Sequence, residues 1–120
     1  MKMKTKRTCL ALDLIDDDSL VAQYEHIHQP ENMWPEIFEG IRKGGIIDMQ
    51  IYRIGTRLFM IVETDDGIDL KSAFEAIGKM PRQAEWADFM RGFQKRLAEA
   101  QSDEHWAEMK PIFMLKNCLE

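Results

Sequence analysis

The chain has 120 residues, enough for one domain built around a single hydrophobic core. Hydrophobic residues make up 45% of it and charged residues 31%, which is typical of a soluble globular domain and not of a disordered or fibrous chain. The net charge of −5 argues against nucleic acid or an anionic membrane surface as the main partner.

We expect one domain over residues 1–120, in the cytoplasm, in which the basic segment Met1 to Arg7 could be a flexible leader. That segment is not followed by an apolar run of signal-peptide length, because Asp13 arrives early, and no stretch approaches the roughly 20 apolar residues of a membrane helix. Cys9 and Cys118 lie near opposite ends without a C-x-x-C spacing. We interpret them as reduced thiols, and the alternative is a disulfide between adjacent terminal strands.

Residues 8–14 alternate strictly between two kinds of side chain, which predicts a strand with unlike faces. The acidic run at 16–18 is typical of a helix N-terminus. In the helix that follows, Tyr24 and His28 are one turn apart and share a face. Pro30 ends this helix, since the residue before a proline is disfavoured in the α region.

A second helical piece and a hairpin come next. Asn32 can cap the helix at its start, and Gly44-Gly45 supplies a left-handed C-cap at its end. Residues 46–54 and 57–63 then alternate on either side of Gly55-Thr56. Because glycine stands at the first central position, we expect a two-residue type II′ turn between two strands.

The last third of the chain predicts two helices and a strand. Residues 70–77 form a short helix, and a longer one runs from Arg82 until Gln101-Ser102-Asp103 closes it. The apolar stripe of the longer helix is formed by Trp86, Phe89, Met90, Phe93 and Leu97. Residues 109–115 are predicted as the last strand.

The predicted order is β-α-β-β-α-β, which indicates an α+β fold with the ferredoxin-like split βαβ arrangement. Helices would cover one face of such a sheet, yet both faces of these strands carry apolar residues. We therefore expect a second copy to cover the bare face, giving a homodimer of the dimeric α/β barrel type.

The richest chemistry lies around the first helix break. A titratable ring, His28, a phenol, Tyr24, and an indole, Trp34, are together suited to a sugar site. Each residue also has an ordinary structural explanation. A histidine at a helix end often caps the helix, and an aromatic residue in the apolar stripe of a helix more often packs in the core than binds a ligand. His26 and His28 do not predict a metal site, since residues two apart on a helix point to different faces.

Five short motifs occur in order along the chain: Tyr24-x3-His28, Trp34-Pro35-Glu36, Ile51-Tyr52, Leu58-Phe59 and Gln83-x2-Trp86. With them the chain resembles, from its first strand to its last, the L-rhamnose mutarotase family of small dimeric enzymes that interconvert sugar anomers. The resemblance implies that His28 is the catalytic proton donor, and that Tyr24 and Trp86 line the sugar site. It also implies a monosaccharide as the substrate.

The chain departs from the family pattern in the wall of that site. Five residues, not three, separate the histidine from Trp-Pro-Glu, the second tryptophan of a usual pair is Ala87, and an aromatic of the second strand is replaced by Met49. We assign Met49 to substrate binding with Tyr24 and Trp86. Because of these departures the sequence does not determine which sugar is the substrate, and L-rhamnose and L-fucose are the leading candidates.

Anomer exchange requires a proton on the ring oxygen and removal of one from the anomeric hydroxyl, so no cofactor or metal is expected. A histidine titrating near pH ~6.5 can exchange protons at neutral pH, which favours His28. Two other functions remain open on the same fold: a cofactor-free monooxygenase and a binding module without catalysis.

Overall fold

The computed structural model describes residues 4–119. The elements within this range are β1 (Thr5–Leu14), α1 (Asp18–Ile27), α2 (Pro35–Lys43), β2 (Ile46–Ile54), β3 (Arg57–Asp65), α3 (Leu70–Gly78), α4 (Gln83–Arg91), β4 (Gln94–Lys95), β5 (Ala107–Glu108) and α5 (Leu115–Cys118). Of the expected leader, residues 1–3 lie outside the described range, whereas Thr5–Arg7 already belong to β1.

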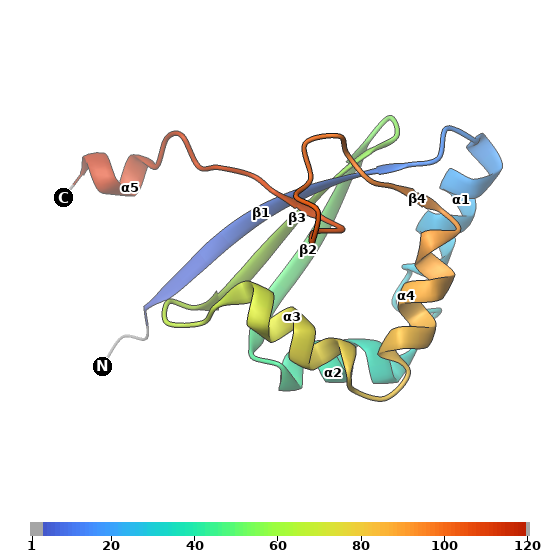
Figure 1. Ribbon diagram of the computed structural model, residues 1–120, viewed down its shortest axis with the longest axis horizontal. Helices are drawn as coiled ribbons and strands as arrows, with labels where there is room; N and C mark the ends of the chain where they lie inside the picture. The colour runs from blue at the N-terminus through green and yellow to red at the C-terminus, as the bar shows by residue number, and fades with distance from the viewer. Residues whose placement is uncertain (1–3, 120) are drawn as a thin grey trace.

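The strands form one antiparallel sheet in the order β2-β3-β1-β4, and β5 also pairs with β1. Two short strands, β4 and β5, share the edge of β1: Leu14 pairs with Gln94, and Leu10 with Glu108. The predicted α+β fold with the ferredoxin-like arrangement is therefore confirmed. In Figure 1 the helices α2, α3 and α4 lie together on one side of the sheet.

The hydrophobic core lies between the sheet and these helices. Alternate residues of β1 and β3 point toward it, and cross-strand pairs such as Leu10 with Met60 and Leu12 with Leu58 are buried. The opposite face carries pairs such as Cys9 with Ile61, in which Cys9 is exposed. The sheet thus buries one face within the chain.

The hairpin between β2 and β3 turns at Gly55-Thr56, as the alternation predicts. Gly55 has φ +58°, in the left-handed region, whereas the only non-glycine residue with positive φ in residues 4–119 is Arg82. A positive φ at the first central residue alone is the signature of a type II′ turn.

The long helix predicted from Arg82 to its close at Gln101-Ser102-Asp103 is wrong in its second half. α4 ends at Arg91, and Gly92 follows as its C-cap. Phe93 is buried, but its carbonyl accepts a hydrogen bond from the Ile15 backbone at 2.9 Å, and Gln94 begins β4. Pairing with the end of β1 therefore overrides the helical spacing of the apolar residues.

The strand predicted over residues 109–115 is also wrong. The segment that pairs with β1 is Ala107–Glu108, and the apolar residues after it leave the sheet. Asn32 likewise does not cap α2: Trp34 occupies the N-cap position, and Pro35 is the first helical residue. None of the helices within residues 4–119 is long and apolar enough to cross a lipid bilayer.

Candidate active site

Helix α1 brings Tyr24 and His28 together. The side chain of Asp17 caps its start by accepting a hydrogen bond from the Leu20 backbone at 3.0 Å. His28 stands at the C-cap, one turn after Tyr24, and the two ring centroids are 4.2 Å apart. The predicted spacing therefore places the phenol and the imidazole in contact.

A cluster of aromatic rings from α2 and α4 supports this pair. Trp86 meets His28 edge-on with centroids 5.5 Å apart, and Trp34 packs against Trp86 at 5.1 Å. Phe89 stacks nearly parallel to Trp34 at 5.8 Å. Edge-to-face and offset aromatic contacts hold rings in defined orientations. The cluster thus fixes the plane of the imidazole.

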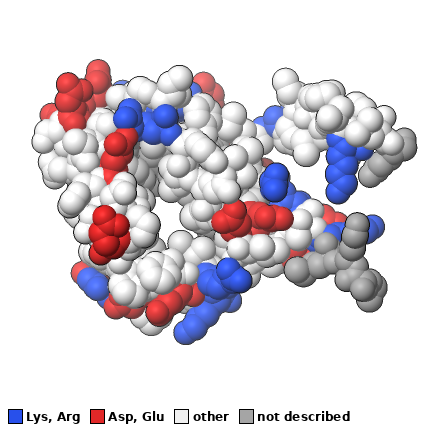
Figure 2. Space-filling view, turned by 180° about the vertical axis from the view of Figure 1, so that it is seen from behind, with Lys and Arg blue, Asp and Glu red and all other residues white. Residues whose placement is uncertain are grey.

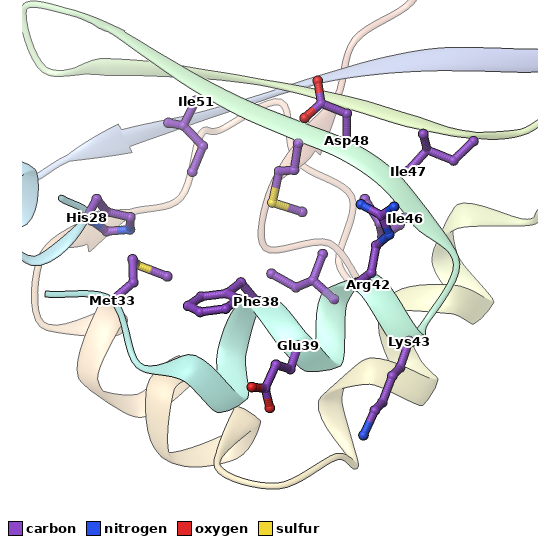
Figure 3. Close-up of a pocket in the computed structure, with 12 residues that line it drawn as sticks. His28, Met33, Phe38, Glu39, Arg42, Lys43, Ile46, Ile47, Asp48 and Ile51 are labelled. Carbon is purple, nitrogen blue, oxygen red and sulfur yellow. The ribbon is translucent and has the colours of Figure 1, made fainter. Parts of the chain in front are cut away.

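His28 also borders an open groove between α2 and β2, with a volume of about 790 Å³. Figure 3 shows its ring at one end of this groove, with Met33 on one side and Ile51 on the other. The groove is lined by His28, Met33, Phe38, Glu39, Ile41, Arg42, Lys43, Ile46, Ile47, Asp48, Met49 and Ile51. Its wall next to His28 is mainly apolar, whereas charged side chains gather at the far end.

The protonation of His28 follows from its contacts. Its Nδ1 lies 2.6 Å from the carbonyl oxygen of Tyr24, which only accepts, so Nδ1 carries the proton. The second nitrogen, Nε2, then holds the lone pair of the neutral ring. Burial lowers the pKa of His28, and the hydrogen bond to Tyr24 opposes this in part. The imidazole is therefore predominantly neutral at pH 7, with a basic Nε2.

The Tyr24 hydroxyl is the end of a short hydrogen-bonded chain. His105 donates from Nε2 to the Gln94 side-chain oxygen at 2.7 Å, and Gln94 donates from Nε2 to the Tyr24 oxygen at 3.1 Å. Burial raises the pKa of Tyr24, and Gln94 lowers it to a lesser degree. Because Tyr24 accepts from Gln94, its own O–H proton is available to another acceptor.

Helix α4 is held against α2 by one buried amide. Gln83 donates from Nε2 to the carbonyl oxygens of Glu36 at 3.2 Å and Ile37 at 3.1 Å. The side chain passes over Gly40, where an added Cβ would lie only 2.5 Å from Nε2. A glycine at this point of α2 therefore sets the separation of the two helices that carry Trp34 and Trp86.

Four residues were predicted for the site, and the structure places them in two layers. His28 and Met49 border the groove, whereas Tyr24 and Trp86 lie against the His28 ring. Tyr24 is only 4% exposed and also packs in the core. Their roles stay predictions.

Sequence reasoning missed the α2 side of the groove, notably Phe38, and the Gln94 contact to Tyr24. The helical periodicity of α2 predicts that Phe38 belongs to that helix. It does not predict which strand Phe38 faces. Gln94 carried no signal, because it fell inside the helix that was predicted too long.

On the face that Figure 2 shows, lysine and arginine lie beside aspartate and glutamate in small mixed groups. No group of three or more histidine, cysteine or acidic residues that could hold a metal ion occurs within residues 4–119. Cys9 and Cys118 are both free and exposed.

The family model for L-rhamnose mutarotase matches residues 7–115. The chain belongs to the L-rhamnose mutarotase family. The L-fucose mutarotase of Xanthomonas campestris pv. campestris is 35% identical over 117 residues, covering 98% of this chain and 94% of that protein. A UPF0734 protein of Dictyostelium discoideum is also 35% identical, over 109 residues, covering 88% and 86%. Mutarotases are isomerases, so this is a family of enzymes.

Two solved structures share the fold of this mutarotase family member. The crystal structure of an L-rhamnose mutarotase from Formosa agariphila has a TM-score of 0.60 at 18% identity, covering 91% of this chain and 97% of that one. Tetracenomycin F2 cyclase from Streptomyces glaucescens, a type-II polyketide cyclase, has a TM-score of 0.61 at 15% identity, covering 91% and 95%. At these identities the two likenesses concern the fold alone.

Proposed function

We propose that this protein interconverts the α and β anomers of a 6-deoxy aldose, L-rhamnose or L-fucose, by general acid–base catalysis at His28. The observation that carries the proposal is the position of His28: a half-buried, neutral imidazole that borders an open groove while its Nδ1 is hydrogen-bonded to the Tyr24 carbonyl. The relative named L-fucose mutarotase supports the choice of reaction.

The neutral ring can move one proton between the two oxygens involved. Its Nε2 takes the proton of the anomeric hydroxyl, and the C1–O5 bond breaks as the imidazolium delivers that proton to the ring oxygen. The aldehyde formed rotates about C1–C2, and the reverse steps close the ring on its other face. Acid–base assistance of this kind contributes roughly 10²–10⁴-fold to a rate.

Three further residues are proposed to hold the sugar. Tyr24 would donate its free O–H proton to a sugar oxygen, and Trp86 keeps the imidazole plane fixed while offering an apolar surface. Met49 lies on the β2 side of the groove. The apolar wall there suits the methyl group of a 6-deoxy sugar better than a hydroxymethyl group.

Exchange NMR of the anomeric protons tests the reaction directly. We expect the protein to accelerate exchange for L-rhamnose or L-fucose, and less for L-mannose and L-galactose, which carry a hydroxyl at C6. His28→Gln should lower the rate roughly 10²–10⁴-fold. His26→Gln is the matched control, since His26 is an exposed histidine on the same helix, and its rate should stay unchanged. If none of the sugars exchanges faster, the proposal is wrong.

We also propose that the protein is a cytoplasmic homodimer. The sheet face that the helices leave uncovered carries Cys9, Tyr52 and Ile61, of which Cys9 and Tyr52 are exposed. A second copy would remove this face from water. Sedimentation velocity at micromolar concentration tests the dimer, and a stable folded monomer would contradict it.

A further inference from the structure

The hydrogen-bonded chain behind Tyr24 ends at a histidine that the proposed reaction does not use. His105 lies in the loop between β4 and β5, two strands that both pair with β1 (Figure 1). The His105 side chain is exposed, whereas Gln94 is half-buried and Tyr24 is buried. The chain of hydrogen bonds therefore runs from the surface inward to the phenol that contacts His28.

The loop holds His105 in place through the residues on either side of it. The Glu104 carboxylate accepts hydrogen bonds from the backbone of Gln101 at 2.8 Å and of Glu108 at 3.3 Å. The Glu104 backbone donates to the Gln101 carbonyl at 3.0 Å. Trp106 packs against both clusters of the hydrophobic core. His105 thus lies between two anchored residues, and the loop itself places the imidazole against Gln94.

The side-chain amide of Gln94 joins two partners of different kinds. An amide accepts at its oxygen and donates at its nitrogen, so it can be inserted between two neighbours in either of two directions. A phenol hydroxyl both donates and accepts, and it therefore fits either end of the amide. Tyr24 cannot determine which way the Gln94 amide points. The partner at the other end of the amide, His105, has to determine it.

His105 donates from Nε2, so the Gln94 oxygen faces the histidine and the Gln94 nitrogen faces Tyr24. With the amide in this direction the Tyr24 oxygen accepts, and its O–H proton is free for another acceptor. In the opposite direction the Tyr24 proton would be used by the Gln94 oxygen. The position of one proton on His105 thus decides the role of a hydroxyl two hydrogen bonds away.

We propose that His105 is a positioning residue for the reaction: its Nε2–H orients the Gln94 amide and keeps the Tyr24 hydroxyl as a donor to a sugar oxygen. The inference rests on the proposed function, in which Tyr24 holds the sugar. Burial, Arg91 and Arg96 lower the pKa of His105, so its ring is mainly neutral at pH 7. A neutral imidazole has one N–H, and only its place on Nε2 serves this role.

The tautomer of His105 can be measured without any sugar. Long-range ¹H–¹⁵N NMR distinguishes the two nitrogens of each neutral ring at about pH 8, above the pKa of an ordinary histidine. We expect the proton on Nε2 in His105 and on Nδ1 in His28, because these are the nitrogens that donate to Gln94 and to the Tyr24 carbonyl. The spectrum of His105→Gln assigns the signals. A proton on Nδ1 of His105 would overturn the inference.

Two variants of similar size separate donation from packing. Glutamine at position 105 can donate, whereas glutamate only accepts. His105→Glu should raise the KM for L-rhamnose or L-fucose roughly fivefold, as expected for one lost neutral hydrogen bond, with little change in kcat. His105→Gln should keep the KM of the natural protein. If both variants raise the KM equally, the ring of His105 matters for packing and not as a donor, and the inference is wrong.

A Tyr24→Phe background provides the control for the path of the effect. Phenylalanine keeps an aromatic ring beside His28 but has no hydroxyl to hold the sugar. His105→Glu should therefore cause no further rise in the KM in this background. An equal rise with and without the Tyr24 hydroxyl would show that His105 does not act through it.

Failure of the reaction and failure of the inference give different results. If the natural protein accelerates the exchange of none of the sugars, the proposed function is wrong, and the tautomer of His105 still decides whether its N–H orients Gln94. If the natural protein accelerates exchange and His105→Glu leaves the KM unchanged, the reaction stands and the positioning role of His105 is overturned.

Discussion

The Nδ1 atom of His28 lies 2.6 Å from the carbonyl oxygen of Tyr24, one helical turn earlier in the chain. The same carbonyl oxygen also accepts a hydrogen bond from the His28 backbone N–H at 3.3 Å, so both the backbone and the ring of His28 bond to the last turn of α1. The contact with the ring fixes the tautomer of the imidazole and leaves Nε2 as the basic nitrogen. The spacing of two residues in the sequence thereby determines which ring atom can accept a proton.

The pH dependence of His28 follows from its burial. Burial lowers its pKa, so the ring should stay neutral at pH values somewhat below 6.5, where an exposed histidine is already half protonated. We expect the NMR titration of His28 to have a lower midpoint in the folded protein than in the protein unfolded in urea. A higher midpoint in the folded protein would contradict the burial argument.

Stability should change with pH in the same sense. Because the folded-state pKa of His28 lies below its unfolded value, the stability that it contributes is complete above about pH 6.5 and is lost as the pH falls through the folded-state pKa. His105 is shifted in the same direction by its burial and by Arg91 and Arg96. The free energy of unfolding in urea should therefore differ less between pH 5 and pH 7.5 in His28→Gln than in the natural protein. The part of the difference that comes from His105 should remain.

The direction of the hydrogen bond between Gln94 and Tyr24 can be reversed with one substitution. In Gln94→Glu the carboxylate only accepts, so it would accept a hydrogen bond from the Tyr24 hydroxyl, which we assign as a donor to the sugar. A lost neutral hydrogen bond of about 1 kcal/mol corresponds to roughly a fivefold higher KM. The same substitution in a Tyr24→Phe background should have no further effect on the KM. An equal effect in both backgrounds would show that Gln94 does not act through Tyr24.

Arg82 combines a strained backbone with a favourable side-chain contact. Its φ of +62° is in the left-handed region, which disfavours any residue with a Cβ. Its guanidinium lies 4.0 Å from the centre of the Trp34 ring and pairs with Glu85. Arg82→Ala loses the contacts and keeps the strain, whereas Arg82→Gly loses both. We expect the glycine variant to have the higher urea midpoint, and the reverse order would contradict the strain.

The sequence predicts the parts of the fold whose signals are local. The hairpin at Gly55-Thr56 and the Tyr24/His28 pair depend on spacings of a few residues, and both are found. The end of α4 and the position of β5 depend instead on which segment reaches the free edge of β1. Phe93 shows the difference. It continues the helical spacing of the apolar residues in α4, but it lies in the segment that connects α4 to β4.

The candidate site divides in the same way. His28 could be selected from its neighbours in the chain, and Met49 from the family pattern. The opposite wall of the groove could not, because Phe38 faces β2 only once the sheet and α2 have packed. The link between Gln94 and Tyr24 joins residues 70 positions apart and has no local signal.

Two helical glycines offer a last, matched prediction about the spacing of the site helices. An added Cβ at Gly40 would lie 2.5 Å from Gln83 Nε2, whereas at Gly78 it would meet nothing within 4 Å. Gly78→Ala should stabilise the protein by up to about 1 kcal/mol, because alanine is the better helix former. Gly40 lies inside α2, whereas Gly78 is the last residue of α3, so the local gain of Gly40→Ala is at least as large, but crowding in a packed interior typically costs about 1–3 kcal/mol.

We therefore expect Gly40→Ala to be less stable than Gly78→Ala in urea unfolding, and to lower the rate of sugar exchange by displacing α4, and with it Trp86, from α2. Gln83→Ala removes the crowded amide, so the two changes should be non-additive: Gly40→Ala should cost less in the Gln83→Ala background than in the natural chain. If the cost is the same in both, the amide of Gln83 is not what requires a glycine at position 40, and the separation of α2 from α4 must be set by other contacts.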